Sequence, residues 1–197
     1  MNSGYYKTKE SVDEYTRLAK DVSGEQLIKK LKKYLQSNSV LLEIGSGPGT
    51  DWNIINRDYK VVGSDNSQEF LKRLICDNPD GRFLELDATT IMIAEKFDGI
   101  YSNKVLHHLK DKELNDSIIR QFDILNTNGI ICHSFWEGEG SEIFKGLYVN
   151  YHTESTLRKF FEKYFEIIML EKYREFEDSD SLLLIGKKKL QLHNITK

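Results

Sequence analysis

The feature that most constrains the fold is a glycine-rich turn that joins a buried apolar segment to the start of a helix. Residues 40–44 are Val-Leu-Leu-Glu-Ile, and Gly45, Gly47 and Gly49 follow them. Glycine lets the backbone turn sharply and approach a ligand closely, because it has no Cβ. The free N–H groups of the next helix favour an anionic group. This pattern predicts a nucleotide-type ligand above the carboxyl end of a buried strand.

Segments with strand and helix periodicity alternate along the chain, which predicts a parallel sheet with helices on both faces. Only about six residues, most of them polar, separate the last two strand candidates, which is too few for a crossover helix, so these should pair antiparallel. The strand candidates are residues 40–44, 60–64, 82–86, 97–101, 130–135, 165–174 and 181–187, and the helix candidates among them are residues 67–75, 111–125 and 153–164. The expected fold class is therefore α/β, with a seven-stranded mixed sheet.

The N-terminal region predicts two helices before the first strand. Ser11 with Glu14, and Ser23 with Gln26, match the capping-box pattern at a helix start. No repeat or Pro/Gly-rich linker divides the 197 residues, and this length is typical of one domain. The expected layout is one domain over residues 1–197, with an N-terminal helical cap at 1–38, a core at 39–190 and a lid segment at about 136–152.

Charge and composition disfavour several classes of protein. The 28 basic and 31 acidic residues nearly cancel, so no nucleic-acid surface is indicated. No apolar run approaches ~18 residues, so we expect no membrane partner. Cys76 and Cys132 form no close pair, which disfavours a disulfide framework and a cysteine-based metal site. We expect a cytoplasmic protein without a metal ion.

The spacing of the glycines distinguishes between kinds of nucleotide ligand. A dinucleotide-binding turn needs glycine at its sixth position, where this chain has Thr50. Asp65 lies at the end of the second strand candidate, about 20 residues after the turn, where a carboxylate can accept both hydroxyls of a ribose. The pattern therefore favours a ribose-containing ligand other than a dinucleotide.

At this point the chain resembles the class I S-adenosylmethionine (SAM)-dependent methyltransferases, and the resemblance covers nearly its whole length. It implies a Rossmann-like fold and SAM as cofactor, with S-adenosylhomocysteine (SAH) as product. The matching motifs are residues 41–50 in the first strand and turn, 61–67 in the second strand, 84–88 beside the adenine, 97–103 with 105–109 after the fourth strand, and 126–130 before the fifth strand. One departure is Asn128, where the family usually has proline.

The resemblance implies roles in the cofactor site. Backbone atoms near Gly45, Ser46 and Gly47 would pass the methionine part of SAM, and Glu43 would support this loop. Asp65 would hold the ribose hydroxyls.

Further positions would complete this cofactor site. Asn66 and the Ala88 amide would lie beside the adenine, and Asp87 would accept from its amino group. The backbone at Ser102 and Asn103 would receive the methionine ammonium group. The resemblance also implies that Tyr6 and Tyr15 close over the cofactor, although ordinary packing is an equal alternative for both.

His107 and His108 are the candidate catalytic residues, because they follow the fourth strand near the expected position of the methyl group. A general base is needed only if the acceptor atom carries a proton. An orienting or packing role is the alternative for both histidines. His133 is expected to be structural, and His152 to lie in a loop or cap.

Aromatic residues after the fifth strand are candidate walls of an acceptor site. These are Trp136, Tyr148 and Tyr151, while Glu137 and Glu139 are expected to be solvated. The motif of methyltransferases that act on exocyclic amino groups is absent, because Ser-Asn-Lys-Val stands at residues 102–105. The expected partner is a small-molecule acceptor, methylated on O or N, and the expected state is a monomer or homodimer.

Two rival functions remain open from the sequence. A SAM-binding protein without methyl transfer would show the same motifs. A nucleotide- or NAD-binding oxidoreductase is a second possibility, which Thr50 and the expected antiparallel terminal strands disfavour.

Overall fold

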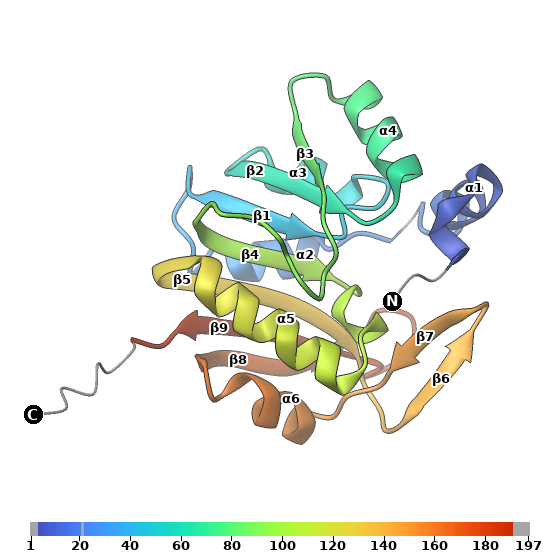
Figure 1. Cartoon of the computed structure of the whole chain (residues 1–197). Coiled ribbons are helices and arrows are strands. Elements are labelled where there is room, and N and C mark those ends of the chain that lie inside the picture. The colour runs from blue at the N-terminus through green and yellow to red at the C-terminus, as the bar shows by residue number, and fades with distance from the viewer. Residues whose placement is uncertain (1–3, 21, 191–197) are drawn as a thin grey trace, which may run out of the picture.

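A seven-stranded mixed sheet forms the centre of the molecule (Figure 1). The computed structural model describes residues 4–20 and 22–190. The strand order is β3-β2-β1-β4-β5-β9-β8, in which β1 to β5 run parallel and β9 pairs antiparallel with both β5 and β8. The strands are β1 (Val40–Ile44), β2 (Lys60–Asp65), β3 (Arg82–Glu85), β4 (Phe97–Asn103), β5 (Leu125–Trp136), β8 (Phe165–Tyr173) and β9 (Ser181–Lys188). The predicted Rossmann-like α/β fold is confirmed.

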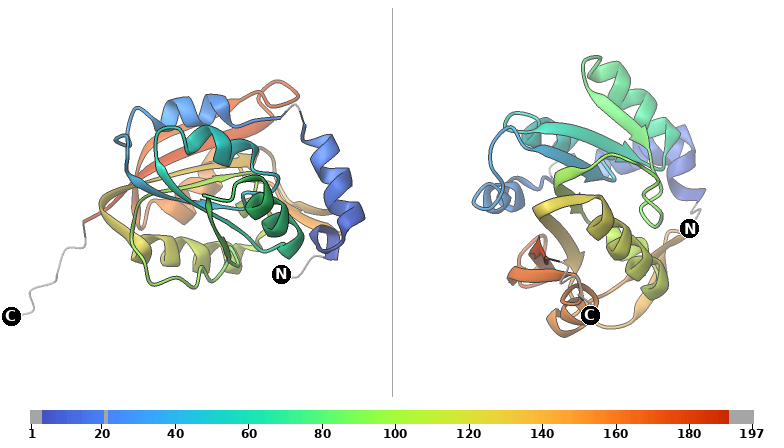
Figure 2. Two further views of the ribbon diagram at one scale, coloured as in Figure 1. Left: turned by 90° about the horizontal axis from the view of Figure 1, so that it is seen from above. Right: turned by 60° about the vertical axis from the view of Figure 1, so that its left-hand side comes forward.

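Helices cover both faces of this sheet, so two apolar layers form. Alternate side chains of a strand point to opposite faces. In β1, Leu41 packs in the layer that holds residues of α2 and α3, whereas Leu42 packs in the layer that holds residues of α5 and α6. Figure 2 (left) shows the sheet between these helices. The helices are α1 (Lys9–Leu18), α2 (Glu25–Leu31), α3 (Thr50–Ile55), α4 (Gln68–Asp77), α5 (Asp111–Ile124) and α6 (Glu154–Phe161), with short 3₁₀ turns η1 (Gly4–Lys7) and η2 (Leu106–His108).

The starts of the first two helices differ from the sequence prediction. Helix α1 begins at Lys9, because the hydroxyl of Thr8 accepts from the amide of Ser11 at 3.2 Å. Helix α2 follows Gly24, with no side-chain cap. The amide of Gly24 instead donates to the Asp51 carboxylate at 2.6 Å. Both predicted capping boxes are therefore wrong, the second because a tertiary contact holds the start of the helix.

The segment after β5 contains a two-stranded hairpin that the sequence did not predict. It consists of β6 (Ser141–Phe144) and β7 (Leu147–Asn150), and it projects from the lower right of Figure 1. Lys145 at its turn forms an ion pair with Glu14 of α1, 2.6 Å long. Within residues 4–20 and 22–190, no helix combines the length and the apolar character that crossing a membrane requires.

Candidate functional site

A cleft lies at the carboxyl ends of β1, β2 and β4, where parallel strands of an open α/β sheet place their ligands. Many of the residues predicted from the sequence meet there. Those that line the cleft are Tyr6, Tyr15, Gly45, Gly47, Asp65, Asn66, Asp87, Ala88, Asn103, His108 and Tyr148. The predicted residues Glu43, Ser46, Ser102, His107, Trp136 and Tyr151 do not line it.

The glycine-rich loop forms the floor of the cleft. Gly45 has φ +74°, and a Cβ added to it would lie 2.4 Å from a methyl carbon of Val105. Gly47 has φ +50°, and its amide donates to the Asp65 carboxylate at 2.9 Å. Left-handed backbone and close packing both favour glycine here. The loop is thus tied to the end of β2.

Glu43 and Ser46 support this loop from behind. The hydroxyl of Ser46 donates to the Glu43 carboxylate at 2.5 Å and accepts from the amide of Ser64 at 3.1 Å. Burial and the nearby charge of Asp51 raise the pKa of Glu43 to about 8. Glu43 therefore holds a proton in this structure at neutral pH.

Two carboxylates on the cleft wall are oriented by backbone amides. Asp65 accepts from Gly47 and, at 2.8 Å, from Ser67. Burial raises the pKa of Asp65, and these two amides oppose the shift. Asp87 accepts from the amide of Thr89 at 2.7 Å. Carboxylate oxygens accept more than one hydrogen bond, so both groups can also receive donors from a ligand.

Asn103 is fixed by a polar network that the sequence analysis missed. Its amide nitrogen donates to Asp51 at 3.0 Å, and its amide oxygen accepts from the Ser134 hydroxyl. Asp51 also accepts from the Tyr101 hydroxyl at 2.7 Å, besides its bond to Gly24. The only sequence signal for Asp51 was its place in the first turn after the glycine loop.

Ser102 turns away from this network. Its hydroxyl lies 2.8 Å from Nδ1 of His133, and Nε2 of His133 lies 2.8 Å from the amide oxygen of Gln121. Burial lowers the pKa of His133 to about 3. This places His133 in a structural role and leaves only the backbone of Ser102 for a ligand.

The two candidate catalytic histidines have different surroundings. His108 lines the cleft, and its Nδ1 lies 2.8 Å from the backbone oxygen of Tyr148. A carbonyl oxygen only accepts, so Nδ1 carries the proton and Nε2 remains a proton acceptor. Burial lowers the pKa of His108, which keeps it neutral. His107 is buried behind it, and within the described residues its Nδ1 has no hydrogen-bond partner.

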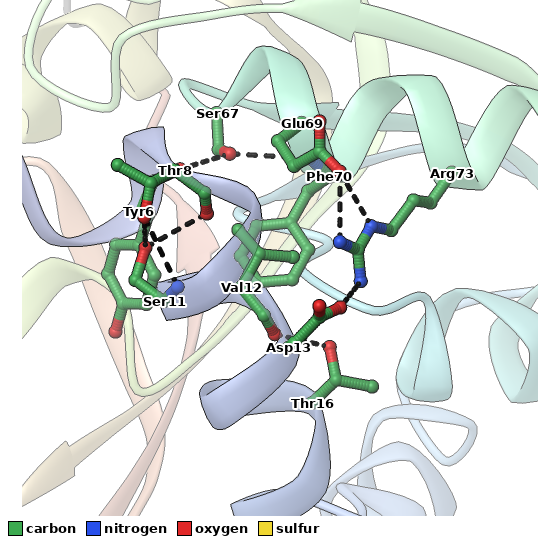
Figure 3. Close-up of polar contacts among 10 residues, drawn as sticks. All are labelled: Tyr6, Thr8, Ser11, Val12, Asp13, Thr16, Ser67, Glu69, Phe70 and Arg73. Carbon is green, nitrogen blue, oxygen red and sulfur yellow. Dashed lines mark hydrogen bonds and ion pairs between the residues drawn. The ribbon is translucent and has the colours of Figure 1, made fainter.

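The N-terminal segment lines one side of the cleft, and Figure 3 shows its polar contacts with α4. The hydroxyl of Ser67 donates to the backbone oxygen of Tyr6 at 2.5 Å, and Arg73 of α4 pairs with Asp13 at 2.7 Å. The Tyr6 ring lies 5.3 Å from that of Tyr15 and 6.4 Å from that of His108. Both predicted tyrosines therefore stand at the cleft, next to the candidate base.

The three predicted acceptor-wall residues do not stay together. Tyr148 lines the cleft, whereas the Tyr151 hydroxyl donates to Glu142 within the hairpin at 2.6 Å. Trp136 packs beneath the ammonium group of Lys104. Lys104 itself lines the cleft, and sequence analysis missed it because its contacts lie far along the chain. The described residues hold no group of three or more His, Cys, Asp or Glu that could bind a metal ion.

Comparisons with solved structures show the same fold in three bacterial proteins. A 1,6-didemethyltoxoflavin-N1-methyltransferase from Burkholderia thailandensis gives a TM-score of 0.77 at 18% identity, covering 92% of this chain and 85% of that chain. The N-methyltransferase NodS from Bradyrhizobium japonicum gives 0.73 at 16% identity, covering 96% and 100%. A TehB-like SAM-dependent methyltransferase from Corynebacterium glutamicum gives 0.74 at 19% identity, covering 95% and 100%.

The sequence itself matches a family model. Residues 41–129, from β1 to the middle of β5, match the model described as a methyltransferase domain. A comparison with curated protein sequences gives no match. The matched residues include the glycine loop, Asp65, Asp87 and His108, which meet at the cleft. Residues 41–129 therefore match a methyltransferase domain, and the chain as a whole has the fold of the three methyltransferases named above.

Proposed function

We propose that the protein transfers the methyl group of SAM to an oxygen or nitrogen atom of a small-molecule acceptor. The observation that carries this proposal is one cleft that joins the glycine loop, Asp65 and Asp87 to a neutral histidine, His108. Two similar structures support the nitrogen acceptor. Their names describe N-methyltransferases, and both hold SAH.

The cleft has the features that a SAM molecule needs. A Cβ at Gly45 would collide with Val105, so only glycine fits where the loop packs against this residue and lines the cleft. Asp65 would hold the ribose hydroxyls, and Asp87 with Ala88 would hold the adenine. The backbone beside Asn103 would take the methionine ammonium group. In bound SAM the methyl group is electrophilic because it is bonded to a sulfonium sulfur. When the methyl group is transferred, the leaving group is the thioether SAH.

The protein's own contribution is to orient the acceptor, exclude water and accept a proton. Tyr148 and, beside the cofactor, Tyr6 line the cleft and would contact the acceptor. His108 is the candidate base, since its Nε2 is free to accept a proton and its Nδ1 is fixed on Tyr148. A base within hydrogen-bond reach of a protonated acceptor atom typically contributes ~10²–10⁴-fold to the rate.

The first experiment tests the cofactor with SAH as the probe. Since a ligand that binds only the folded state stabilises it, SAH should raise the unfolding temperature, whereas NAD should not. Asp65→Ala should abolish most of this shift. Asp80→Ala, which removes an exposed carboxylate, is the matched control. Stabilisation by NAD and not by SAH would refute the proposal.

The second experiment tests methyl transfer and the acceptor. Small molecules that carry hydroxyl or amino groups are incubated with the protein and labelled SAM, and products are identified by mass. We expect label on O or N of at least one compound. SAH binding with no methylated product across such a library would favour the SAM-binding protein without methyl transfer.

A further inference from the structure

Lys104 is a residue for which the proposed chemistry gives no role. It follows the last residue of β4 and lines the cleft. Its φ is +53°, in the left-handed region that lysine rarely adopts. Its amide donates to the Ser134 hydroxyl at 2.9 Å, which holds the backbone in place. Strained backbone persists only where surrounding contacts impose it, so the contacts of this side chain are informative.

The ammonium group of Lys104 is held by groups other than carboxylates. Its Nζ donates to the backbone oxygen of Phe135 at 2.9 Å and to the Ser181 hydroxyl at 2.7 Å. It also lies 3.4 Å from the centroid of the Trp136 ring. A cation over an indole face is attracted by the ring quadrupole, most strongly when water is excluded. One side chain thereby joins the ends of β4 and β5 to the start of β9.

This contact extends to the rim of the molecule through Trp136. The ring of Trp136 stacks on Phe176, with centroids 5.9 Å apart and planes at 25°. Phe176 belongs to the turn 174–180 and is 59% exposed. Asp180 shapes this turn by accepting from three successive amides, those of residues 175–177. The stack Lys104–Trp136–Phe176 thus supports an exposed aromatic residue in the turn between β8 and β9.

We propose that Lys104 is a positioning residue for the acceptor side of the cleft, whose ammonium group holds the Trp136 indole and, through it, Phe176 and the turn 174–180. This inference rests on the proposed function: Lys104 lines the cleft beside Asn103 and His108, whereas Trp136 and the turn 174–180 lie outside the cleft lining and act on it only through Lys104. The bonding partners of Nζ lie on β5 and β9, away from the glycine loop and Asp65. We call the contact between the Lys104 ammonium group and the Trp136 ring the clamp. Its loss should therefore leave cofactor binding unchanged.

Protonation of Lys104 gives the clamp a measurable signature. Burial lowers the pKa of Lys104 to about 7, and the carboxylates of Glu175 and Asp180 oppose the shift. The other titratable groups that face it are Tyr173 of β8, whose ring centroid lies 5.5 Å from Nζ, and His107 of η2. The pKa of Tyr173 is raised and that of His107 is lowered, so neither titrates near pH 7. The charge over Trp136 should disappear as the pH rises through neutrality.

The experiment follows the emission of Trp136 from about pH 6 to about pH 9, a range set by the lowered lysine pKa. The chain has two tryptophans, so the difference between the wild type and Trp136→Phe isolates Trp136. We expect the emission of Trp136, obtained as this difference, to change with a midpoint near neutral pH when residue 104 is lysine. In Lys104→Met, the titration should vanish and acrylamide should quench Trp136 more strongly. Lys104→Arg, which stays charged, should show no titration but retain the protection from acrylamide.

Each outcome decides for or against the clamp. A titration that persists in Lys104→Met, or unchanged protection in that variant, would overturn it. If Lys104→Met does not fold, quenching of Trp136 in the wild type that is as strong as quenching of a fully exposed indole refutes the clamp by itself. SAH affinity of Lys104→Arg and Lys104→Met should stay within about twofold of the wild type. A larger loss would place Lys104 on the cofactor side, whereas absent SAH binding in the wild type would count against the proposed function instead.

Discussion

At the scale of single residues, the site depends on groups whose protonation the fold has altered. Glu43 lies beneath the glycine loop with a pKa of about 8. The unfolded chain loses this proton near the ordinary value of 4.5. Between these values the folded state binds more protons than the unfolded state, so its stability falls as the pH rises.

Glu43→Gln tests this coupling. The amide keeps the shape of a protonated carboxyl group but cannot ionise. The free energy of unfolding of the variant should therefore not decrease between pH 4.5 and pH 8, unlike that of the wild type. Urea unfolding at several pH values would measure the effect. Equal pH dependence in the variant and the wild type would show that Glu43 is ionised in the folded protein.

His108→Asn separates the two nitrogens of the candidate base. The asparagine amide can still donate to the backbone oxygen of Tyr148, as Nδ1 does, but nothing replaces Nε2. With an acceptor found by the methylation screen, we expect kcat to fall by ~10²–10⁴ if the acceptor atom carries a proton. SAH affinity, measured by calorimetry, should not change. With an acceptor whose methylated atom carries a proton, an unaltered kcat would assign His108 to packing.

At the scale of elements, α1 and α4 show which kind of contact holds a helix over the cleft. Val12 of α1 is fully buried, whereas the Arg73–Asp13 pair is partly exposed. Exposed ion pairs contribute ~0–1 kcal/mol, and truncating a buried aliphatic side chain removes more than that. Apolar packing should therefore dominate the docking of α1, with the ion pair in Figure 3 setting its orientation.

Val12→Ala should loosen α1 more than Asp13→Ala does. Tyr15 stands over the loop, 3.9 Å from the position of a Cβ on Gly47, so this loosening should also weaken SAH binding several-fold. Limited proteolysis at Arg17 and calorimetry with SAH would measure both effects. The opposite ranking of the two variants would show that the ion pair dominates.

At the scale of the whole molecule, two apolar layers share one sheet. Each strand of β1, β4 and β5 contributes to both layers, so neither layer can be lost without the other. We propose that residues 4–20 and 22–190 form a single domain on this basis. The hairpin β6–β7 projects from this core, and Leu147 and Tyr148 of β7 line the cleft.

A single cooperative unfolding transition is the expected result. Urea unfolding followed by circular dichroism and by tryptophan emission should give the same midpoint. Leu42→Ala, at a fully buried position of the central strand, should lower the free energy of unfolding by ~2–5 kcal/mol without separating the two curves. Two distinct midpoints would contradict the single-domain proposal.

The sequence predicted the parts of the fold that depend on local periodicity. All seven strands of the sheet were recognised, because apolar alternation and turn residues are local features. The helices predicted from residues 67 and 153 begin there in the structure, with Ser67 and Thr153 as their N-caps. The start of α2 was not predicted correctly, because its N-terminal amide is held by Asp51, far along the chain.

By itself, the sequence determined the class of the fold and the floor of the cleft. Gly45, Asp65 and Asp87 each follow a strand at a recognisable spacing, and parallel strands bring their carboxyl ends to one edge. Only the tertiary structure decided which side chains meet across that edge. Lys104 bonds Ser181 across 77 positions, and Trp136 leaves the cleft wall to pack beneath that lysine. Such contacts depend on how β5, β8 and β9 pack together. They join residues that are far apart in the sequence, which no local sequence pattern encodes.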